Sequence, residues 1–280
     1  MLISVALFAM LSLIAKLLGT DTLGSPLHPM QISAARFIFA FFALSLFFML
    51  KPVSFERVPW GLHIRRGIAG WCGVTCLFAA AILIPLADAT AISFLSIIVT
   101  MGLSMLMLKE KAGPRRWIAA FIALIGALLI TRPGTSAFQP VAMVAFLAAL
   151  FIGFEIIFIK QLSGREPLLR ILIINNLIGA SISATVVGFV WQTPSSAQWL
   201  LMLAIGVLML GVQATNILAM KLGDASFVAP FWFATPAFAA LLDFLVFSQI
   251  ISITSAIGIL LIIFAGVFIS WREQKARQTG

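Results

Sequence analysis

The tetrapeptide Leu86-Ala87-Asp88-Ala89 returns as Leu222-Gly223-Asp224-Ala225, about half a chain length later. A match this short is a weak sign of an internal repeat by itself. It gains weight because each copy stands between two long apolar segments, and because five such segments lie in each half of the chain. The sequence therefore predicts two five-helix repeats, residues 1–134 and residues 135–280, the second ending in a short basic tail.

The composition places these segments in a membrane. Of the 280 residues, 62% are hydrophobic and 10% are charged, whereas soluble domains have a charged share of about 25%. A bilayer core about 30 Å thick is crossed by about 20 apolar residues of helix. The apolar segments span residues 2–18, 31–50, 65–84, 89–108, 115–131, 140–161, 168–190, 198–220, 225–247 and 252–271. An all-α integral membrane protein with ten transmembrane helices is predicted.

The basic residues predict the orientation of these helices. If the N-terminus is cytoplasmic, 15 of the 18 Lys and Arg residues fall on the cytoplasmic side, and Arg132 alone falls in an outside loop. This bias follows the positive-inside rule. We expect a multi-pass protein of the cell inner (plasma) membrane with both termini in the cytoplasm. The positive charge is scattered over short loops, so no nucleic-acid partner is expected.

An odd number of spans in each repeat inverts the second repeat relative to the first. In proteins built this way the substrate site lies near the membrane midplane, where the repeats meet and rock to open either side. The arrangement favours a secondary transporter that works by alternating access.

The chain resembles the EamA family of the drug/metabolite transporter superfamily. The resemblance is carried by Leu62-His63-Ile64-Arg65-Arg66-Gly67, Pro85-Leu86-Ala87-Asp88-Ala89, Leu108-Lys109-Glu110 and Asp224-Ala225-Ser226-Phe227-Val228-Ala229-Pro230. It implies ten helices in two inverted five-helix repeats around a central cavity, with export or uptake of small metabolites. Within the superfamily, we expect the chain to resemble the YddG-like amino-acid exporters most, with carriers for S-adenosylmethionine or riboflavin nearly as similar.

The resemblance predicts a function and excludes others. We expect export of amino acids, aromatic or otherwise hydrophobic; the alternative is uptake or exchange of a nucleotide-like metabolite such as S-adenosylmethionine or riboflavin. An enzyme is not expected, because the sequence has no nucleophile elbow and no paired carboxylates within one segment. Without a cluster of metal ligands, and with His28 and His63 placed in loops, neither a metal nor a cofactor is expected.

Two charged residues inside predicted spans are candidates for the transport site. An ionised side chain at a helix centre costs about 2.5–3.5 kcal/mol, so it must be paired, hydrated or neutral. Glu155 is a candidate for proton coupling or for binding a substrate amine; the alternative is a structural partner for Arg36 or Lys16. Arg36 is a candidate for binding a substrate carboxylate, which guanidinium matches with two parallel hydrogen bonds. Its alternative is snorkelling to the outer headgroups or pairing within the bundle.

Neutral side chains complete the expected binding site. Ser96 and Thr100 belong to a polar stripe on the fourth segment, which either lines a cavity or lets helices pack closely. Asn176, Gln213 and Asn216 offer donors and acceptors to a substrate or to a neighbouring helix.

The ninth segment is expected to bend. Pro230 and Pro236 are predicted to kink it and to act as a hinge. Trp232 lies between them and is expected to form an aromatic wall against the substrate, with Trp71 behind it; the alternative is bulk that faces lipid. Asp224, just before this segment, is expected to cap the helix.

Overall fold

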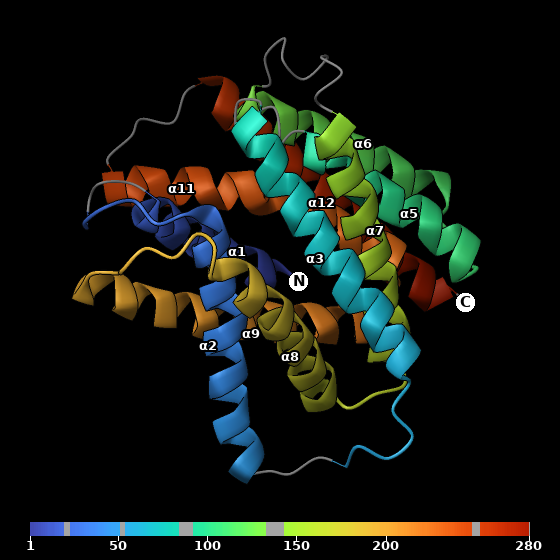
Figure 1. Cartoon of the computed structure of the whole chain (residues 1–280). Helices are drawn as coiled ribbons and strands as arrows, with labels where there is room; N and C mark the ends of the chain where they lie inside the picture. The colour runs from blue at the N-terminus through green and yellow to red at the C-terminus, as the bar shows by residue number, and fades with distance from the viewer. Residues whose placement is uncertain (20–22, 51–53, 84–91, 133–142, 248–252, 280) are drawn as a thin grey trace.

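The computed structural model describes residues 1–19, 23–50, 54–83, 92–132, 143–247 and 253–279. Within these ranges all regular structure is helical (Figure 1). The helices are α1 (Leu2–Leu18), α2 (Pro29–Leu50), α3 (Trp60–Leu83), α5 (Leu95–Met107), α6 (Pro114–Thr131), α7 (Met143–Ser163), α8 (Leu168–Val187), α9 (Ser196–Leu222), α10 (Ala225–Val228), η3 (Ala229–Ala234), α11 (Thr235–Phe247) and α12 (Ile253–Thr279). The expected all-helical fold is confirmed, with α10, η3 and α11 together forming the ninth segment.

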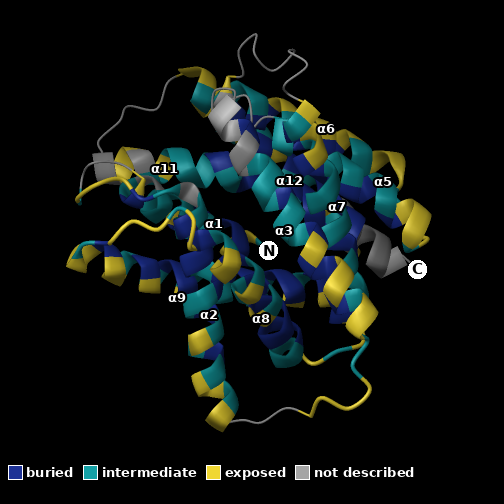
Figure 2. Ribbon diagram, viewed as in Figure 1, coloured by how far each residue is buried: buried dark blue, intermediate teal, exposed yellow. Residues whose placement is uncertain are grey.

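Large apolar side chains cover the outside of the bundle. Leu50, Leu106 and Leu260 are 81%, 79% and 65% exposed. Figure 2 shows exposed residues along the outward sides of the helices and buried residues facing inward. Because water would destabilise so extensive an apolar surface, these side chains face lipid in a bilayer.

Among the described residues, six helices are long and apolar enough to cross a membrane by length and composition. They lie at Met30–Leu50, Met143–Ser163, Leu168–Val187, Ser196–Leu222, Ala225–Leu242 and Ile253–Trp271. Shorter apolar helices lie at Leu2–Ala15 and Leu95–Met107. The chain is therefore a multi-pass membrane protein.

The two halves interlock. Helix α3, the third of the first half, packs against α7, the first of the second half. Reciprocally, α1, the first of the first half, packs against α9, the third of the second half. Each of α2 and α6 packs against its own counterpart in the other half, α8 and α12 respectively. Figure 1 shows α3 and α7 side by side in the middle of the molecule. This reciprocal pairing is what two repeats related by an approximate two-fold axis produce, and it places the interior of the bundle between the halves.

Glycines let helices of the two halves approach closely. A Cβ atom on Gly126 of α6 would lie 2.6 Å from the carbonyl oxygen of Gly258 on α12, and one on Gly258 would lie 2.5 Å from that of Gly126. On α3, a Cβ on Gly73 would lie 2.8 Å from the Ile152 side chain of α7. In a bilayer, where lipid is as apolar as the side chains, helix association depends on such close packing.

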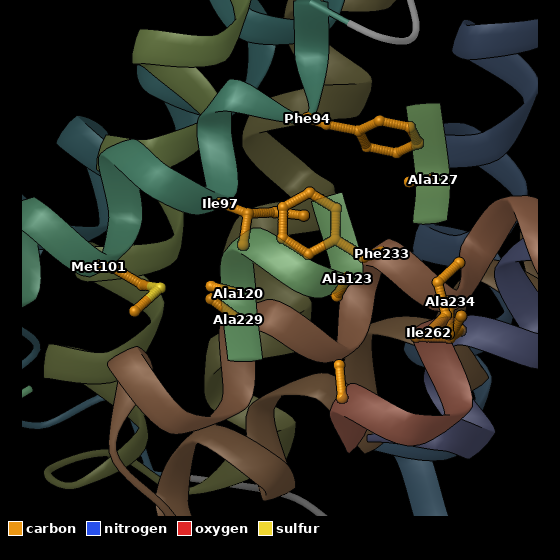
Figure 3. Packing of buried hydrophobic residues seen from close by; sticks show 12 residues of the cluster. Phe94, Ile97, Met101, Ala120, Ala123, Ala127, Ala229, Phe233, Ala234 and Ile262 are labelled. Atoms are coloured by element: carbon orange, nitrogen blue, oxygen red, sulfur yellow. The ribbon is translucent and has the colours of Figure 1, made fainter. Parts of the chain in front are cut away.

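An apolar cluster holds the broken ninth segment between the halves (Figure 3). The Phe94 and Phe233 rings meet with their centroids 5.7 Å apart. Ala120 and Ala123 of α6 and Ile262 of α12 belong to the same cluster. Aromatic burial of this kind, with small residues opposite, anchors η3 to α5 and α6.

Candidate functional site

The ninth segment changes helix type between the two prolines. Helix α10 ends at Val228, the chain continues as the 3₁₀ helix η3, and the α-helix resumes at Thr235. Pro230 and Pro236 each lack the N–H that an α-helix needs for its hydrogen-bond ladder. The segment thus departs from a regular helix between the two prolines, and the hinge remains a prediction.

The two candidate tryptophans lie in different surroundings. Trp232 on η3 meets Phe8 of α1 edge to face, with ring centroids 5.4 Å apart. Its Nε1 is buried and finds no hydrogen-bond acceptor in the described part of the chain. Trp71 of α3 instead lines a small cavity together with Phe37 of α2 and Ser183 of α8.

A group of charged side chains lies inside the bundle. Glu155 of α7 is close enough to Arg36 of α2 and Arg66 of α3 to interact electrostatically with both. No ion pair or hydrogen bond joins the three side chains among the described residues, and Nε of both arginines is buried and unpaired there. Glu155 fits into the interior because it lies against Gly70, where a Cβ atom would be 2.9 Å from the Glu155 Cδ atom.

The charges of this group are incompletely compensated by the described residues: Arg36 lies over the Phe37 ring, 4.4 Å from its centroid, while nitrogens of Arg36 and Arg66 lack hydrogen-bond acceptors. Removing charges from water costs several kcal/mol per ion unless geometry and hydrogen bonds compensate. Opposite charges that face each other without touching can accept a molecule that carries both an anionic and a cationic group. Arg36 belongs to the first half and Glu155 to the second, so such a molecule would bridge the halves.

The candidate amides lie together between α8 and α9. Asn176 Nδ2 donates to Gln213 Oε1 at 3.2 Å, and Gln213 Nε2 donates to Asn176 Oδ1 at 3.3 Å. Asn175 Nδ2 donates to the same Gln213 oxygen at 3.2 Å. Asn216, three residues after Gln213, is buried, and its Oδ1 has no donor in the described ranges. Asn176 and Gln213 thus bind each other, while Asn216 keeps an acceptor for another partner.

The hydroxyl stripe lies at a helix crossing. Thr100 Oγ1 donates to the Ser96 carbonyl oxygen of its own helix at 2.7 Å. Opposite, a Cβ on Gly153 of α7 would lie 2.6 Å from the Val99 side chain and 3.5 Å from the Ser96 oxygen. The structure therefore places this part of the stripe where α5 and α7 pack closely.

At one end of the bundle, a carboxylate from the first half caps a helix of the second. Glu110 accepts hydrogen bonds from the backbone N–H groups of Ala225 at 2.9 Å and Ser226 at 3.0 Å, and from the Ser226 hydroxyl at 2.9 Å. Asp224 occupies the expected N-cap position, but its side chain makes no capping hydrogen bond. The cap expected from Asp224 is thus supplied by Glu110.

Two cations strengthen the same junction. Arg116 of α6 donates to Ser226 Oγ at 2.6 Å and to Asp224 Oδ2 at 3.0 Å. Lys160 of α7 donates to the carbonyl oxygens of Met220 at 2.8 Å and Gly223 at 2.5 Å, at the C-terminal end of α9. We call the end of the bundle that carries these contacts and the loops at 54–59 and 164–167 the basic end.

The prediction that His63 lies in a loop was wrong. Helix α3 begins at Trp60, directly after Pro59, whose carbonyl accepts from His63 N–H at 3.2 Å. His63 and Arg66 are consequently buried, each 1% exposed. Arg170 lies in the first turn of α8. The available signal was the spacing of three between His63 and Arg66, which places both on one helix face.

Some predicted positions lie outside the described residues. They are Asp88, which belongs to the repeated tetrapeptide, and the side chain of Lys16.

The fold and these contacts define a class of protein: a multi-pass membrane protein of two interlocked, inverted five-helix repeats with charged groups between them. The model of the EamA-like transporter family matches residues 1–132 and 139–271, so the chain belongs to the EamA-like transporter family. A crystal structure of another protein agrees with this fold, with a TM-score of 0.82 at 20% identity over 96% of this chain and 94% of that one.

Three relatives carry more specific names. The S-adenosylmethionine uptake transporter of Rickettsia prowazekii is 26% identical over 91% of this chain and 87% of its own length. The riboflavin transporter of Vibrio cholerae is 28% identical over 80% of this chain and 76% of its own length. The pseudopaline exporter of Pseudomonas aeruginosa is 26% identical over 85% of this chain and 87% of its own length. None of these three is named as an amino-acid exporter, so the resemblance to such exporters stays a prediction.

Proposed function

We propose that this transporter moves a small metabolite with an amino-acid end, meaning an amino group and a carboxylate on the same carbon. The observation that carries the proposal is the buried pair of Arg36 and Glu155, which act on each other electrostatically from the two halves without forming an ion pair in the described part of the chain. Arg36 would bind the carboxylate in a forked geometry. Glu155 would bind the ammonium group, or carry a coupling proton when that group is absent.

The neighbouring residues fit the same cargo. Asn216 has an unused carbonyl oxygen near the bonded pair Asn176 and Gln213. Trp71 and Trp232 would contact the remainder of the molecule as aromatic surfaces. Ser96 and Thr100 would act through the packing of α5 on α7. Lipid surrounds the bundle, and a small molecule is the only partner that the site requires.

Two cargoes satisfy this description. Free amino acids are one, and we expect their export. S-adenosylmethionine is the other, because it is an amino-acid derivative. A relative similar to this chain is named as its uptake transporter. Riboflavin, which names another relative, has no amino-acid end and does not use the Arg36 and Glu155 pair.

Alternating access follows from the two inverted halves. The contacts of Glu110 and Arg116 join the two halves at the basic end, and we propose that this end faces the cytoplasm of the cell inner membrane. Rocking of α7 to α12 against the first half would break these contacts and expose the charged group to that side.

The test is counterflow in liposomes that contain the purified protein. Labelled phenylalanine, methionine, serine, S-adenosylmethionine and riboflavin are each assayed with and without a pH gradient. We expect saturable exchange of at least one compound with an amino-acid end. Its amide, which lacks the carboxylate, should compete at least ten-fold more weakly. Exchange of riboflavin alone, or equal competition by the amide, would refute the amino-acid end.

A matched pair of variants links the activity to the site. Arg36→Gln should lower the rate of exchange at least ten-fold, because the buried carboxylate of the cargo loses its guanidinium partner. Arg65→Gln removes an exposed arginine and should leave the rate within two-fold.

A further inference from the structure

A second polar group lies at the basic end of the bundle and shares Arg66 with the charged group that contains Arg36 and Glu155. It consists of His63 and Arg66 on α3 with Glu166 and Arg170 at the start of α8. Arg66 and Arg170 both lie close enough to His63 to act on it electrostatically. Arg170 Nη1 donates to Glu166 Oε2 at 3.0 Å. This group joins α3 to α8.

The group is buried and its hydrogen-bonding capacity is unused. His63 and Arg66 are each 1% exposed, and the side chains of Arg170 and Glu166 are 11% and 5% exposed. The buried atoms without a partner among the described residues are Nδ1 and Nε2 of His63, Nε and Nη1 of Arg66, and Nε of Arg170. Apart from one ring nitrogen of a neutral His63, each of these atoms is a donor.

The charges are not balanced. Arg66 and Arg170 each carry a positive charge, and Glu166 is the one acid in the group. Glu155 acts on Arg66 and also on Arg36, so Arg36, Arg66 and Arg170 share two acids. One positive charge therefore remains within a buried site. Leaving such a charge uncompensated is costly, and a single anion would remove the imbalance.

The helix ends favour the same ligand. Both α3 and α8 begin at this end, at Trp60 and Leu168. The N-terminal turn of a helix carries a partial positive charge and N–H groups without intrahelical acceptors. These contributions add to the two guanidinium groups.

We infer that His63, Arg66 and Arg170 form a binding site for one compact oxyanion, a phosphate group or one of similar charge, with Glu166 competing for Arg170. The occupant is either a free anion or the phosphate of a lipid headgroup at the basic end. The site shares Arg66 with the charged group that the proposed cargo would contact, so it is tested without cargo.

The experiment titrates inorganic phosphate into the full chain held in nanodiscs of neutral phosphatidylcholine, with binding measured by calorimetry. We expect one phosphate per chain. Glu166→Gln should tighten binding at least three-fold, because Arg170 is released and the net charge of the site rises by one. His63→Leu should weaken binding at least ten-fold, and Arg65→Gln, which alters an exposed neighbour, should change it less than two-fold.

The source of the anion is separated by a second arm. If a lipid occupies the site, the wild type should have a higher melting temperature in nanodiscs of phosphatidylglycerol than in nanodiscs of phosphatidylcholine. This rise should be smaller for His63→Leu. The lipid should also abolish the phosphate signal in the calorimeter. A free anion should give the same phosphate affinity in both lipids. Two results would overturn the site: folded wild type that responds to neither phosphate nor anionic lipid, or a response that Glu166→Gln and His63→Leu leave unchanged. The gain expected for Glu166→Gln cannot arise from misfolding.

Discussion

At the scale of single residues, Gly70 determines where the Glu155 carboxylate can lie. Because Gly70 has no side chain, the Glu155 carboxylate can occupy the space beside it. A Cβ atom added to Gly70 would lie 2.9 Å from the Glu155 Cδ atom. The carboxylate is the flexible end of its side chain, so an added methyl group would displace it rather than break the helix packing.

Gly70→Ala should therefore impair transport without unfolding the protein. We expect at least a ten-fold lower exchange rate in liposomes, with a melting temperature close to that of the wild type, since Ala favours a helix over Gly by about 0.5–1 kcal/mol. Gly61→Ala on the same helix is the matched control, because its Cβ would meet nothing within 4 Å. Equal activity of both variants would show that the position of Glu155 does not matter.

Glu155 itself is the candidate for proton coupling. Glu155→Gln keeps the shape and a carbonyl acceptor for the ammonium group but cannot release a proton, so we expect binding of cargo to persist in weakened form and the response to a pH gradient to disappear. Exchange is measured with and without the gradient, and Glu56→Gln, in an exposed loop, is the control. Gradient dependence that survives in Glu155→Gln would exclude this role.

At the scale of elements, the crossing of α6 and α12 leaves no room for a side chain. Gly126 and Gly258 each face the other's backbone carbonyl, and backbone atoms yield less easily than side-chain ends. Gly126→Ala should destabilise the fold by about 1–3 kcal/mol, the usual cost of overpacking. Thermal unfolding in detergent measures this loss. Gly102→Ala on α5, where a Cβ meets nothing within 4 Å, should not lower the melting temperature, and a similar fall in both would contradict the packing argument.

The 3₁₀ helix η3 presents Trp232 beside Phe8 rather than to lipid alone. If this ring lines the transport path, Trp232→Ala should weaken competition by phenylalanine at least five-fold more than competition by serine. Trp60→Ala removes a tryptophan that is 50% exposed at the start of α3 and should affect neither. An equal loss for both amino acids in Trp232→Ala would indicate a folding defect.

At the scale of the whole molecule, the basic end is closed by contacts between segments more than 100 residues apart. Glu110 binds the N–H groups of Ala225 and Ser226 across the two halves. Hydrogen bonds to a charged group are worth about 1.5–3 kcal/mol each. Opening this end toward the solvent requires that they break.

Glu110→Gln should weaken this closure. We expect the amide hydrogens of Ala225 and Ser226 to exchange with deuterium at least ten-fold faster, because a neutral amide accepts more weakly and offers one acceptor oxygen in place of two. Hydrogen–deuterium exchange with mass spectrometry measures this. Lys111→Gln alters an exposed residue of the same loop and should leave the exchange unchanged, while unaltered protection in Glu110→Gln would show that the cap does not hold this end shut.

Much of the architecture could be predicted from the sequence. Long apolar runs in lipid can satisfy their backbone groups only as helices, so the helical segments and their near-repeat in two halves follow from local information. The break at Pro230 and Pro236 follows from a missing N–H at each proline. The charged candidates Arg36 and Glu155 were visible because ionisable residues are rare within spans.

The partners of these residues depend on the tertiary structure. Whether a polar side chain near a helix end reaches the headgroups or is buried depends on which helix lies beside it, which is why His63 was assigned to a loop. The N–H group of Ser226 is capped by Glu110, which lies 116 residues away in the sequence. Patterns of neighbouring residues cannot predict a contact over such a separation. The sequence by itself determined the helices, the repeat and the family resemblance, because these depend on neighbours along the chain. Only the tertiary structure decided which charges meet in the interior, because that depends on how α2, α3, α7 and α8 pack.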